Sequence, residues 1–448
     1  MVSVAQGTVS PQRRRLLPSG WPLYALFAGF PLWWVLGLGG FIWLILAIPM
    51  AAWLFRQKAV LAPKGFRIWV GFMLWMLGSS SRLDSPDRYI VFIYRAGLYV
   101  AVTIILLYVF NISREALPTG KVIAIMTFFW MFVVVGGLMG VLFPTLNFSS
   151  PTEMVMPGNL ISDEFVYDLV HPATAQIQDF LGYDEARPKA PFVYATNWGS
   201  AFALLVPFVI LGWTYAKTRA WKLVTGVMFV ISIVPVVASL ARGLWLSLGA
   251  GLVYAAIRLA IGGKGKALRA ILILIPTLLA VVYLSPLRGL VTDRFSHQHS
   301  NERRVGLYEE AIANVKESPL LGYGSPRPSE ENSDAPSVGT QGQLWLVLFS
   351  HGIPGMIFFG WWFFYQLWRM RHVSSPVAFW CHVLVFIAFV QLPFYGWLPA
   401  PLAVIMVGIA LGAREQRLDR AELRRRDLGP RSPGADSVQA WTRTRVEP

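Results

Sequence analysis

The chain has 448 residues, of which 55% are hydrophobic, 14% are charged and one is cysteine, and its formal net charge is +15. Soluble domains carry about a quarter charged residues, and one globular core of this length cannot bury so much apolar surface. The composition excludes a soluble enzyme, a disordered chain and a disulfide scaffold, and it favours an all-α polytopic membrane protein over a nucleic-acid-binding one.

Twelve apolar stretches are candidates for membrane spans, because a helix needs about 20 mostly apolar residues to cross a bilayer. In chain order they are 21–38, 40–55, 66–80, 89–110, 121–143, 191–216, 221–241, 243–262, 270–287, 342–367, 377–395 and 397–412. They predict the following segments: an N-terminus 1–20, a bundle of five spans 21–143, a long loop 144–190, spans six to nine over 191–287, a second long loop 288–341, spans ten to twelve over 342–412, and an Arg-rich tail 413–448.

The distribution of charge predicts the orientation. If the N-terminus is cytoplasmic, 27 of the 39 Lys and Arg residues fall in inside segments, 11 fall outside, and Arg95 lies within a span. The positive-inside rule therefore places both termini in the cytoplasm. All 24 Asp and Glu residues lie outside the spans. Proton- and sodium-coupled carriers usually need a carboxylate near the midplane, so this pattern disfavours a coupled transporter.

The two long loops, predicted to be external, are candidates for function because loops of this length are uncommon. The first, 144–190, contains seven acidic residues. The second contains an expected amphipathic helix over 301–316, with Val305, Tyr308, Ile312 and Val315 on one face. Such a helix is expected to lie on the outer membrane surface.

Several arginines lie where the positive-inside rule does not favour them, namely Arg95, Arg187, Arg242, Arg303 and Arg304. Each alone is explained by snorkelling or by a salt bridge to a loop acid. Together they favour an anionic ligand at the outer leaflet, because guanidinium groups match phosphate oxygens bidentately. A polyprenyl-diphosphate lipid fits that description.

Residues 191–360 resemble the O-antigen ligase/polymerase superfamily of bacterial surface-polysaccharide assembly. The resemblance rests on Arg187 with the 191–197 stretch, on Arg242-x3-Leu246, on Arg304-x3-Tyr308 continuing to Pro319-Leu-Leu-Gly322-Tyr-Gly324, and on Gly352-x2-Gly355. It implies a multi-pass glycosyltransferase of the GT-C type in the cytoplasmic (inner) membrane, active at its outer face without a metal or other cofactor. The implied partners are a polyprenyl-diphosphate-linked oligosaccharide, membrane lipid, and an acceptor that is a glycan or another lipid-linked glycan.

One position departs from the ligase pattern. Ligases commonly have a histidine eleven residues before the first glycine of the last motif, and this chain has Gln341 there. An amide cannot take a proton at physiological pH, so the departure favours a polymerase or an exopolysaccharide-type member over a ligase.

In the predicted mechanism, an acceptor hydroxyl attacks the anomeric carbon of the donor. The diphosphate is bound by Arg242 and Arg187, together with Arg304 or Arg95, which stabilise the charge that develops on it. Candidate bases are Glu309 and Glu310, followed by Glu302 and Asp293. We expect His351 to be a packed membrane histidine and His297 and His299 to be solvated.

Two alternatives stay open. One is an enzyme of the peptidoglycan-polymerase type, in which Asp293 would mimic the external aspartate. The other is a transporter or flippase of a lipid-linked glycan, although the sequence has no convincing internal repeat.

Overall fold

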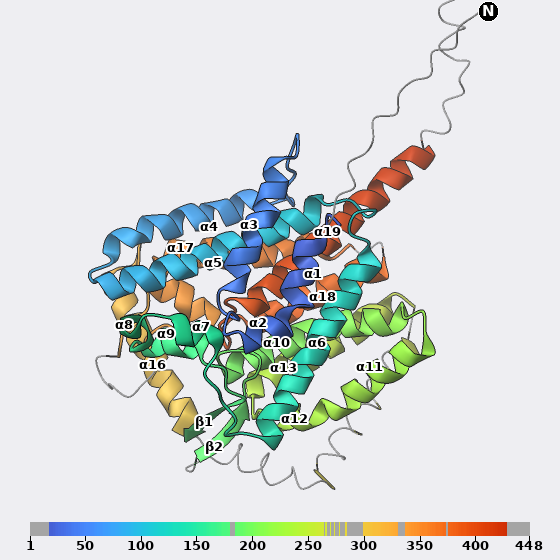
Figure 1. The fold of residues 1–448 in the computed structure, drawn as a ribbon. Helices are drawn as coiled ribbons and strands as arrows, with labels where there is room; N and C mark the ends of the chain where they lie inside the picture. The colour runs from blue at the N-terminus through green and yellow to red at the C-terminus, as the bar shows by residue number, and fades with distance from the viewer. Residues whose placement is uncertain are drawn as a thin grey trace, which may run out of the picture.

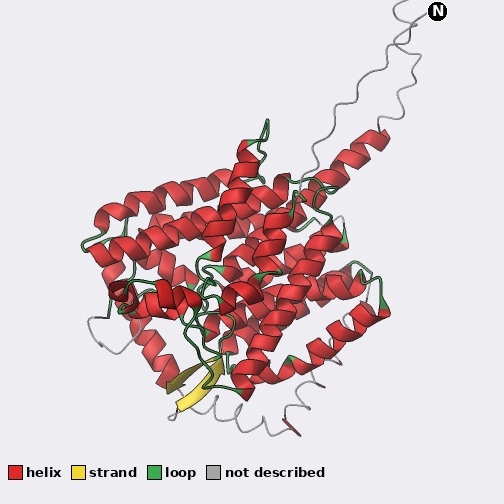
Figure 2. Cartoon of the chain, in the orientation of Figure 1, coloured by secondary structure: helices red, strands yellow, loops and turns green. Residues whose placement is uncertain are grey.

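The computed structural model describes residues 18–179, 184–263, 299–329, 337–372 and 375–427, together with isolated positions between 265 and 284. The described chain is predominantly helical (Figure 1), and Figure 2 shows one short β-hairpin beside the helices. The predicted all-α class is therefore confirmed at this level.

The first part of the chain forms one group of helices, α1 to α6, and a set of short helices within the first long loop. The long group and its connections are α1 (Trp21–Phe27), α2 (Phe30–Val35), α3 (Ile42–Phe55), α4 (Phe66–Ser79), the 3-10 turn η1 (Ser80–Arg82), α5 (Pro86–Asn111) and α6 (Thr119–Leu142). The first long loop holds α7 (Pro151–Val155), α8 (Gly158–Ile161), α9 (Glu164–Val170), β1 (Ala175–Asp179) and β2 (Asp184–Pro188).

The second part begins with α10 (Ala195–Thr214), α11 (Arg219–Ile231), α12 (Ile233–Ala238) and α13 (Arg242–Ile261). It continues with α16 (His299–Glu317), α17 (Gln343–Met370), α18 (Pro376–Gln391) and α19 (Ala400–Asp427).

Six helical stretches among the described residues are long and apolar enough to cross a membrane: Pro86–Asn111, Thr119–Leu142, Ala195–Thr214, Arg219–Ala238, Arg242–Ile261 and Gln343–Met370. The shorter apolar helices α3 and α18 coincide with two more predicted spans. The predicted span 270–287 lies almost wholly outside the described residues. The structure thus supports a multi-pass membrane protein, while the count of twelve and the orientation stay predictions.

Two predicted spans are each interrupted, and a proline follows each break. The stretch 21–38 forms α1 and α2 on either side of Gly29, with Pro31 near the start of α2. Similarly, α11 ends before Ser232, and Pro235 lies in the first turn of α12. Proline lacks the N–H that a helix interior requires but is tolerated in a first turn. The first predicted span is therefore divided into two short helices, whereas Arg219–Ala238 as a whole stays long and apolar enough to cross a membrane.

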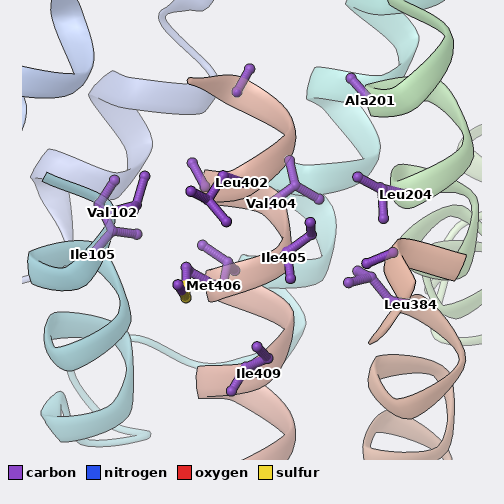
Figure 3. Packing of buried hydrophobic residues seen from close by; sticks show 14 of the residues in the cluster. Val102, Ile105, Ala201, Leu204, Leu384, Leu402, Val404, Ile405, Met406 and Ile409 are labelled. Atoms are coloured by element: carbon purple, nitrogen blue, oxygen red, sulfur yellow. The ribbon is translucent and has the colours of Figure 1, made fainter. Parts of the chain in front are cut away.

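Helix α19 lies at the centre of the core. Its residues Val404, Ile405 and Met406 are fully buried. Figure 3 shows these side chains between Val102 and Ile105 of α5 on one side and residues of α10 and α18 on the other. Because its surroundings are protein on all sides, α19 is apolar all round over this stretch, as expected for a buried helix.

The same helix extends into the predicted Arg-rich tail, because α19 continues past residue 412 to Asp427. Arg414 is only 1% exposed and donates to the carbonyls of Ile112 and Leu117. Arg114 forms an ion pair with Glu415. The first turns of the predicted solvated tail are therefore packed against the α5–α6 connection.

The expected amphipathic helix exists as α16, but part of its predicted apolar face was wrong. Leu307, Ala311 and Val315 are buried, whereas Val305 and Ile312 are about half exposed. Leu307 and Ala311 pack with Phe349 of α17 in a small second core. This side of α16 is therefore covered by protein rather than by a membrane surface.

The first long loop is ordered by local capping and by one tight backbone approach. Ser150 and Glu153 form a capping box at the start of α7, and Ser150 Oγ also donates to the Val170 carbonyl at 2.6 Å. A Cβ on Gly37, which has φ +73°, would lie 2.7 Å from that carbonyl. Only glycine permits this contact, so Gly37 lets the loop rest on the end of α2.

Candidate functional site

A cavity of about 970 Å³ lies between α5, the first long loop, the start of α10, and the segments just before α17 and around 394–401. This volume is at the upper end of the range for small-molecule sites. Its polar lining residues are Tyr94, Arg95, Glu164, Asp168, His171, Gln176, Arg187, Lys189, Tyr194, Thr196, Asn197, Ser337, Thr340, Gln341 and Gln343. The predicted site residues Arg95, Arg187 and Gln341 thus meet at one cavity, although they are far apart in sequence.

Arg95 enters the cavity wall from α5, in surroundings of aromatic and hydroxyl groups. Tyr94, Tyr99 and Tyr194 interact with its guanidinium electrostatically. Its Nη1 atom is buried and has no hydrogen-bond partner in the part of the chain that the structure describes. An arginine in a membrane-spanning helix is costly unless it is paired. The Arg95 guanidinium therefore retains hydrogen-bonding capacity at the wall of the cavity.

Arg187 and Lys189 bring two more cations from the end of β2. Arg187 is 7% exposed and donates from Nε to the carbonyl of Ser239 at 2.9 Å. Lys189 is 9% exposed, and burial lowers its pKa while the nearby Asp168 carboxylate opposes that shift. The β-hairpin pairs Gln176 with Arg187, which fixes where these side chains leave the backbone.

The other predicted cations and carboxylates occupy different places. Arg242 is the first residue of α13 and is not a lining residue of the cavity. Arg304 lies in α16, and its side chain is outside the described part of the structure. Glu309 is exposed, and Glu310 is buried and accepts from Ser329 Oγ at 2.7 Å. Neither glutamate lines the cavity.

The structure describes only some of the histidines and of the remaining acidic candidates. Asp293 and His297 lie outside the described residues, as do the side chains of Glu302 and His299. His351 is 5% exposed, and its Nδ1 lies 2.8 Å from Ser79 Oγ. The expectation that His351 is a packed membrane histidine is confirmed.

Two carboxylates that the sequence did not single out line the cavity. Glu164 and Asp168 are four residues apart on α9, which places them on one face of that helix. Burial raises the pKa of Asp168, with Lys189 partly opposing the shift. The acidic content of the first long loop, with this spacing, was the available signal in the sequence.

His171 also lines the cavity and is held from both sides. Its Nδ1 lies 2.9 Å from Glu153 Oε2, and its Nε2 lies 3.2 Å from Asn147 Oδ1. Its ring stacks on Tyr167 with the centroids 4.6 Å apart. His171 therefore joins the parts of the first long loop that enclose the cavity.

Two glutamines lie at the junction with α17. The Gln341 carbonyl accepts from the Tyr308 hydroxyl at 3.4 Å. Gln343, the first residue of α17, donates from Nε2 to the Tyr99 hydroxyl at 2.7 Å and accepts at Oε1 from the Trp397 N–H at 2.9 Å. Gln343 thereby ties α5, α17 and the segment before α19 together, a role that the sequence did not indicate.

The last two motif pieces of the resemblance also meet in space. Helix α17 is interrupted at Gly352, where φ is +70° and ψ is −174°. The carbonyls of Phe349 and Ser350 accept from the N–H groups of Tyr323 and Gly324 at 3.0 and 2.7 Å. Because the break leaves these carbonyls without helical hydrogen bonds, the N–H groups of the 319–324 turn can donate to them.

These features define a helical membrane protein with a polar cavity that gathers cationic side chains. Within the chain, residues 227–360 match the family model described as O-antigen ligase. The match confirms the resemblance to the O-antigen ligase/polymerase superfamily and indicates a membrane enzyme of polysaccharide assembly that transfers glycan.

The match spans less than a third of the chain and runs from α11 into α17. It therefore includes Gln341 and Gln343, while Arg95, Asp168, Arg187 and Lys189 lie outside it. No curated protein and no solved structure matches the chain.

Proposed function

We propose that the chain is a glycosyltransferase that polymerises or transfers glycan from a polyprenyl-diphosphate-linked donor at the outer face of the cytoplasmic membrane. The donor diphosphate occupies the cavity, where Arg95, Arg187 and Lys189 bind it. The observation that carries this proposal is the Arg95 guanidinium at the cavity wall, with a buried Nη1 that no described group satisfies.

The charge of the cavity supports a diphosphate rather than a neutral sugar alone. Three cationic side chains line it against two carboxylates, those of Glu164 and Asp168. Arg187 is already oriented through one nitrogen by the Ser239 carbonyl. Such fixed donors stabilise a phosphate oxygen with little further ordering. The aromatic and amide side chains of the same lining suit sugar rings and hydroxyls.

Arg242 keeps a part in this proposal as a neighbour of the cavity. It begins α13, three residues after the Ser239 carbonyl that Arg187 binds. A helix N-terminus adds positive potential to that of the guanidinium. We propose that Arg242 binds the part of the diphosphate that lies nearer the outside of the cavity. Arg304 stays a further candidate for binding the diphosphate.

In the proposed reaction, an acceptor sugar hydroxyl attacks the anomeric carbon of the donor. The bond between that carbon and the phosphate oxygen breaks, and the diphosphate leaves with the electron pair. Guanidinium groups that bind the leaving oxygens more strongly as charge develops lower the barrier. Gln341 in place of the ligase histidine favours a lipid-linked repeat unit as the acceptor, and hence a polymerase.

The test is glycan transfer by the purified full chain in liposomes that contain lipid-linked donor. Arg95→Gln and Arg187→Gln are expected to lower kcat/KM by about a hundredfold, because each removes a charged donor to the transition state. Arg258→Gln is the matched control, since it removes another helix arginine that binds the Tyr254 hydroxyl and the Arg371 carbonyl away from the cavity.

Unchanged transfer in both cavity variants would contradict the diphosphate site. Counterflow of intact lipid-linked glycan, with no longer products, would instead identify a flippase. Longer lipid-linked products identify a polymerase, and transfer only to a final acceptor identifies a ligase.

A further inference from the structure

The acceptor hydroxyl must lose its proton during transfer, and the cavity restricts which group receives it. Gln341 cannot hold a proton, and Glu309 and Glu310 do not line the cavity. The described cavity residues that take up a proton readily are Glu164, Asp168 and His171.

These three groups differ in their burial and in their hydrogen-bond partners. His171 has a ring nitrogen against Glu153 and the other against Asn147, so both nitrogens are already engaged. Glu164 is exposed at the start of α9. Asp168 lies one turn further along the same face and is only partly exposed. Of the three, Asp168 combines a partly buried position with a carboxylate facing the cavity.

Asp168 also lies close to the proposed diphosphate site. It interacts electrostatically with Lys189, and it shares Tyr194 as a neighbour with Arg95. The Asp168 carboxylate therefore interacts with Lys189, one of the cations that the proposed function assigns to the donor, and Asp168 and Arg95 both interact with Tyr194. An acceptor hydroxyl beside Asp168 would lie near the donor headgroup.

We propose that Asp168 is the general base that accepts the proton of the acceptor hydroxyl. This inference rests on the proposed function. In the step, the hydroxyl O–H bond breaks and its proton passes to the Asp168 carboxylate. The hydroxyl oxygen forms the new glycosidic bond, and the donor carbon–oxygen bond breaks toward the diphosphate. Asp168 then releases the proton to water, which restores the carboxylate.

The electrostatics of the site agree with this role. Burial raises the pKa of Asp168, and Glu164 acts in the same direction, while Lys189 and His171 lower it. Tyr194, just before α10, interacts electrostatically with the same carboxylate, and burial raises the pKa of Tyr194 to about 12, so it stays neutral at physiological pH. A carboxylate with a raised pKa is a stronger base while still ionised at neutral pH.

The proposed role of Asp168 determines how the transfer rate changes with pH. The base works only when ionised, so the rate is present above the Asp168 pKa and is lost as the pH falls through it. The acidic limb of the rate profile should therefore lie above the ordinary range of an aspartate.

The experiment measures transfer by the full chain in liposomes under single-turnover conditions from pH 4 to 8, with donor affinity measured separately. Asp168→Asn is expected to slow transfer by about a hundredfold or more, to leave donor affinity within about threefold, and to abolish the acidic limb. Glu185→Gln is the matched control, because its carboxyl also has a pKa raised by burial in the same loop but does not line the cavity.

Asp168→Glu keeps a carboxylate and should retain the acidic limb at a reduced rate. An Asp168→Asn variant with the wild-type rate and pH profile overturns the inference while the proposed function stands. A wild-type chain that binds donor but transfers no glycan overturns both. If Asp168→Asn does not fold, an Asp168→Glu variant without an acidic limb overturns the assignment by itself.

Discussion

Gly322 and Gly352 meet backbone to backbone, although thirty positions separate them in the sequence. A Cβ on Gly322 would lie 2.7 Å from the Gly352 nitrogen, and a Cβ on Gly352 would lie 2.6 Å from the Pro319 carbonyl oxygen. Both residues have positive φ, +61° and +70°. The contact connects the turn after α16 to the break in α17, so the glycines of two motif pieces act as one joint.

This joint predicts a large loss of stability for Gly352→Ala. The substitution forces a Cβ into backbone atoms at a φ/ψ combination that only glycine adopts easily, so we expect a cost of about 3 kcal/mol. Gly360→Ala is the control, because this glycine is in the same helix and its Cβ would meet nothing within 4 Å. Thermal unfolding in detergent measures both, and equal effects of the two substitutions would contradict the joint.

Gln343→Leu should destabilise the region where α5, α17 and the segment before α19 meet. The substitution leaves the Tyr99 hydroxyl and the buried Trp397 N–H without the partner that now satisfies them. A buried polar group left without a partner costs about 1–3 kcal/mol. Gln341→Leu is the comparison, because the Gln341 side chain makes only a 3.4 Å contact with Thr340. Chemical denaturation in micelles should separate the two variants by more than about 1 kcal/mol.

The hydrogen bonds of Glu153 predict that the first long loop becomes less stable in acid. Burial raises the pKa of Glu153, but hydrogen bonds from His171 and from the Ser150 N–H outweigh it, so the net pKa lies below the usual value of 4.5. A lowered folded-state pKa gives stability that is present above 4.5 and is lost as the pH falls through the folded-state value.

Hydrogen exchange of residues 151–170 should therefore accelerate as the pH falls below about 4.5, after correction for the intrinsic rate. Glu153→Gln should make exchange faster at neutral pH and remove most of the acid dependence. Protection that is the same in both proteins at every pH would show that Glu153 does not hold the loop.

Arg414→Leu should weaken the attachment of the extended part of α19. The substitution removes donors from the carbonyls of Ile112 and Leu117 in a buried site, which costs about 2 kcal/mol. Arg417→Leu is the control, because Arg417 is less buried and donates to one carbonyl, that of Phe110, whereas Arg414 donates to two carbonyls and to Thr119 Oγ1 at 3.1 Å. Limited proteolysis near residue 414 should increase only in the first variant, and equal cleavage of the two would contradict the packing.

Prediction from the sequence succeeded where one property repeats along the chain. Runs of apolar residues located α5, α6, α10 and α17, and the family resemblance agrees with the match over residues 227–360. Prediction failed where a single residue or a tertiary contact decides. Proline and glycine divide the first predicted span, and the partner helix α17 determines which side of α16 is buried.

The candidate site shows the same division. Arg95 and Arg187 were selected because cations are costly near a membrane, and both line the cavity. Asp168 was not selected, because its i,i+4 spacing to Glu164 was the only local signal and six other acidic residues share the loop. Gln343 was not selected, because nothing in its local sequence distinguishes it from other polar residues. Glu309 and Glu310 were selected as carboxylates on the predicted surface helix, and neither lines the cavity.

By itself, the sequence determined that this chain is a helical membrane protein with unusual arginines, since hydropathy and charge are sums over neighbouring residues. The relationship to polysaccharide assembly came from the motif resemblance, with which the family match agrees. Only the tertiary structure decided which of the scattered polar groups share a cavity, because that depends on contacts between α5, α9, the β-hairpin and the start of α17. Those contacts are set by the shapes of packed side chains, which no local pattern of residues encodes.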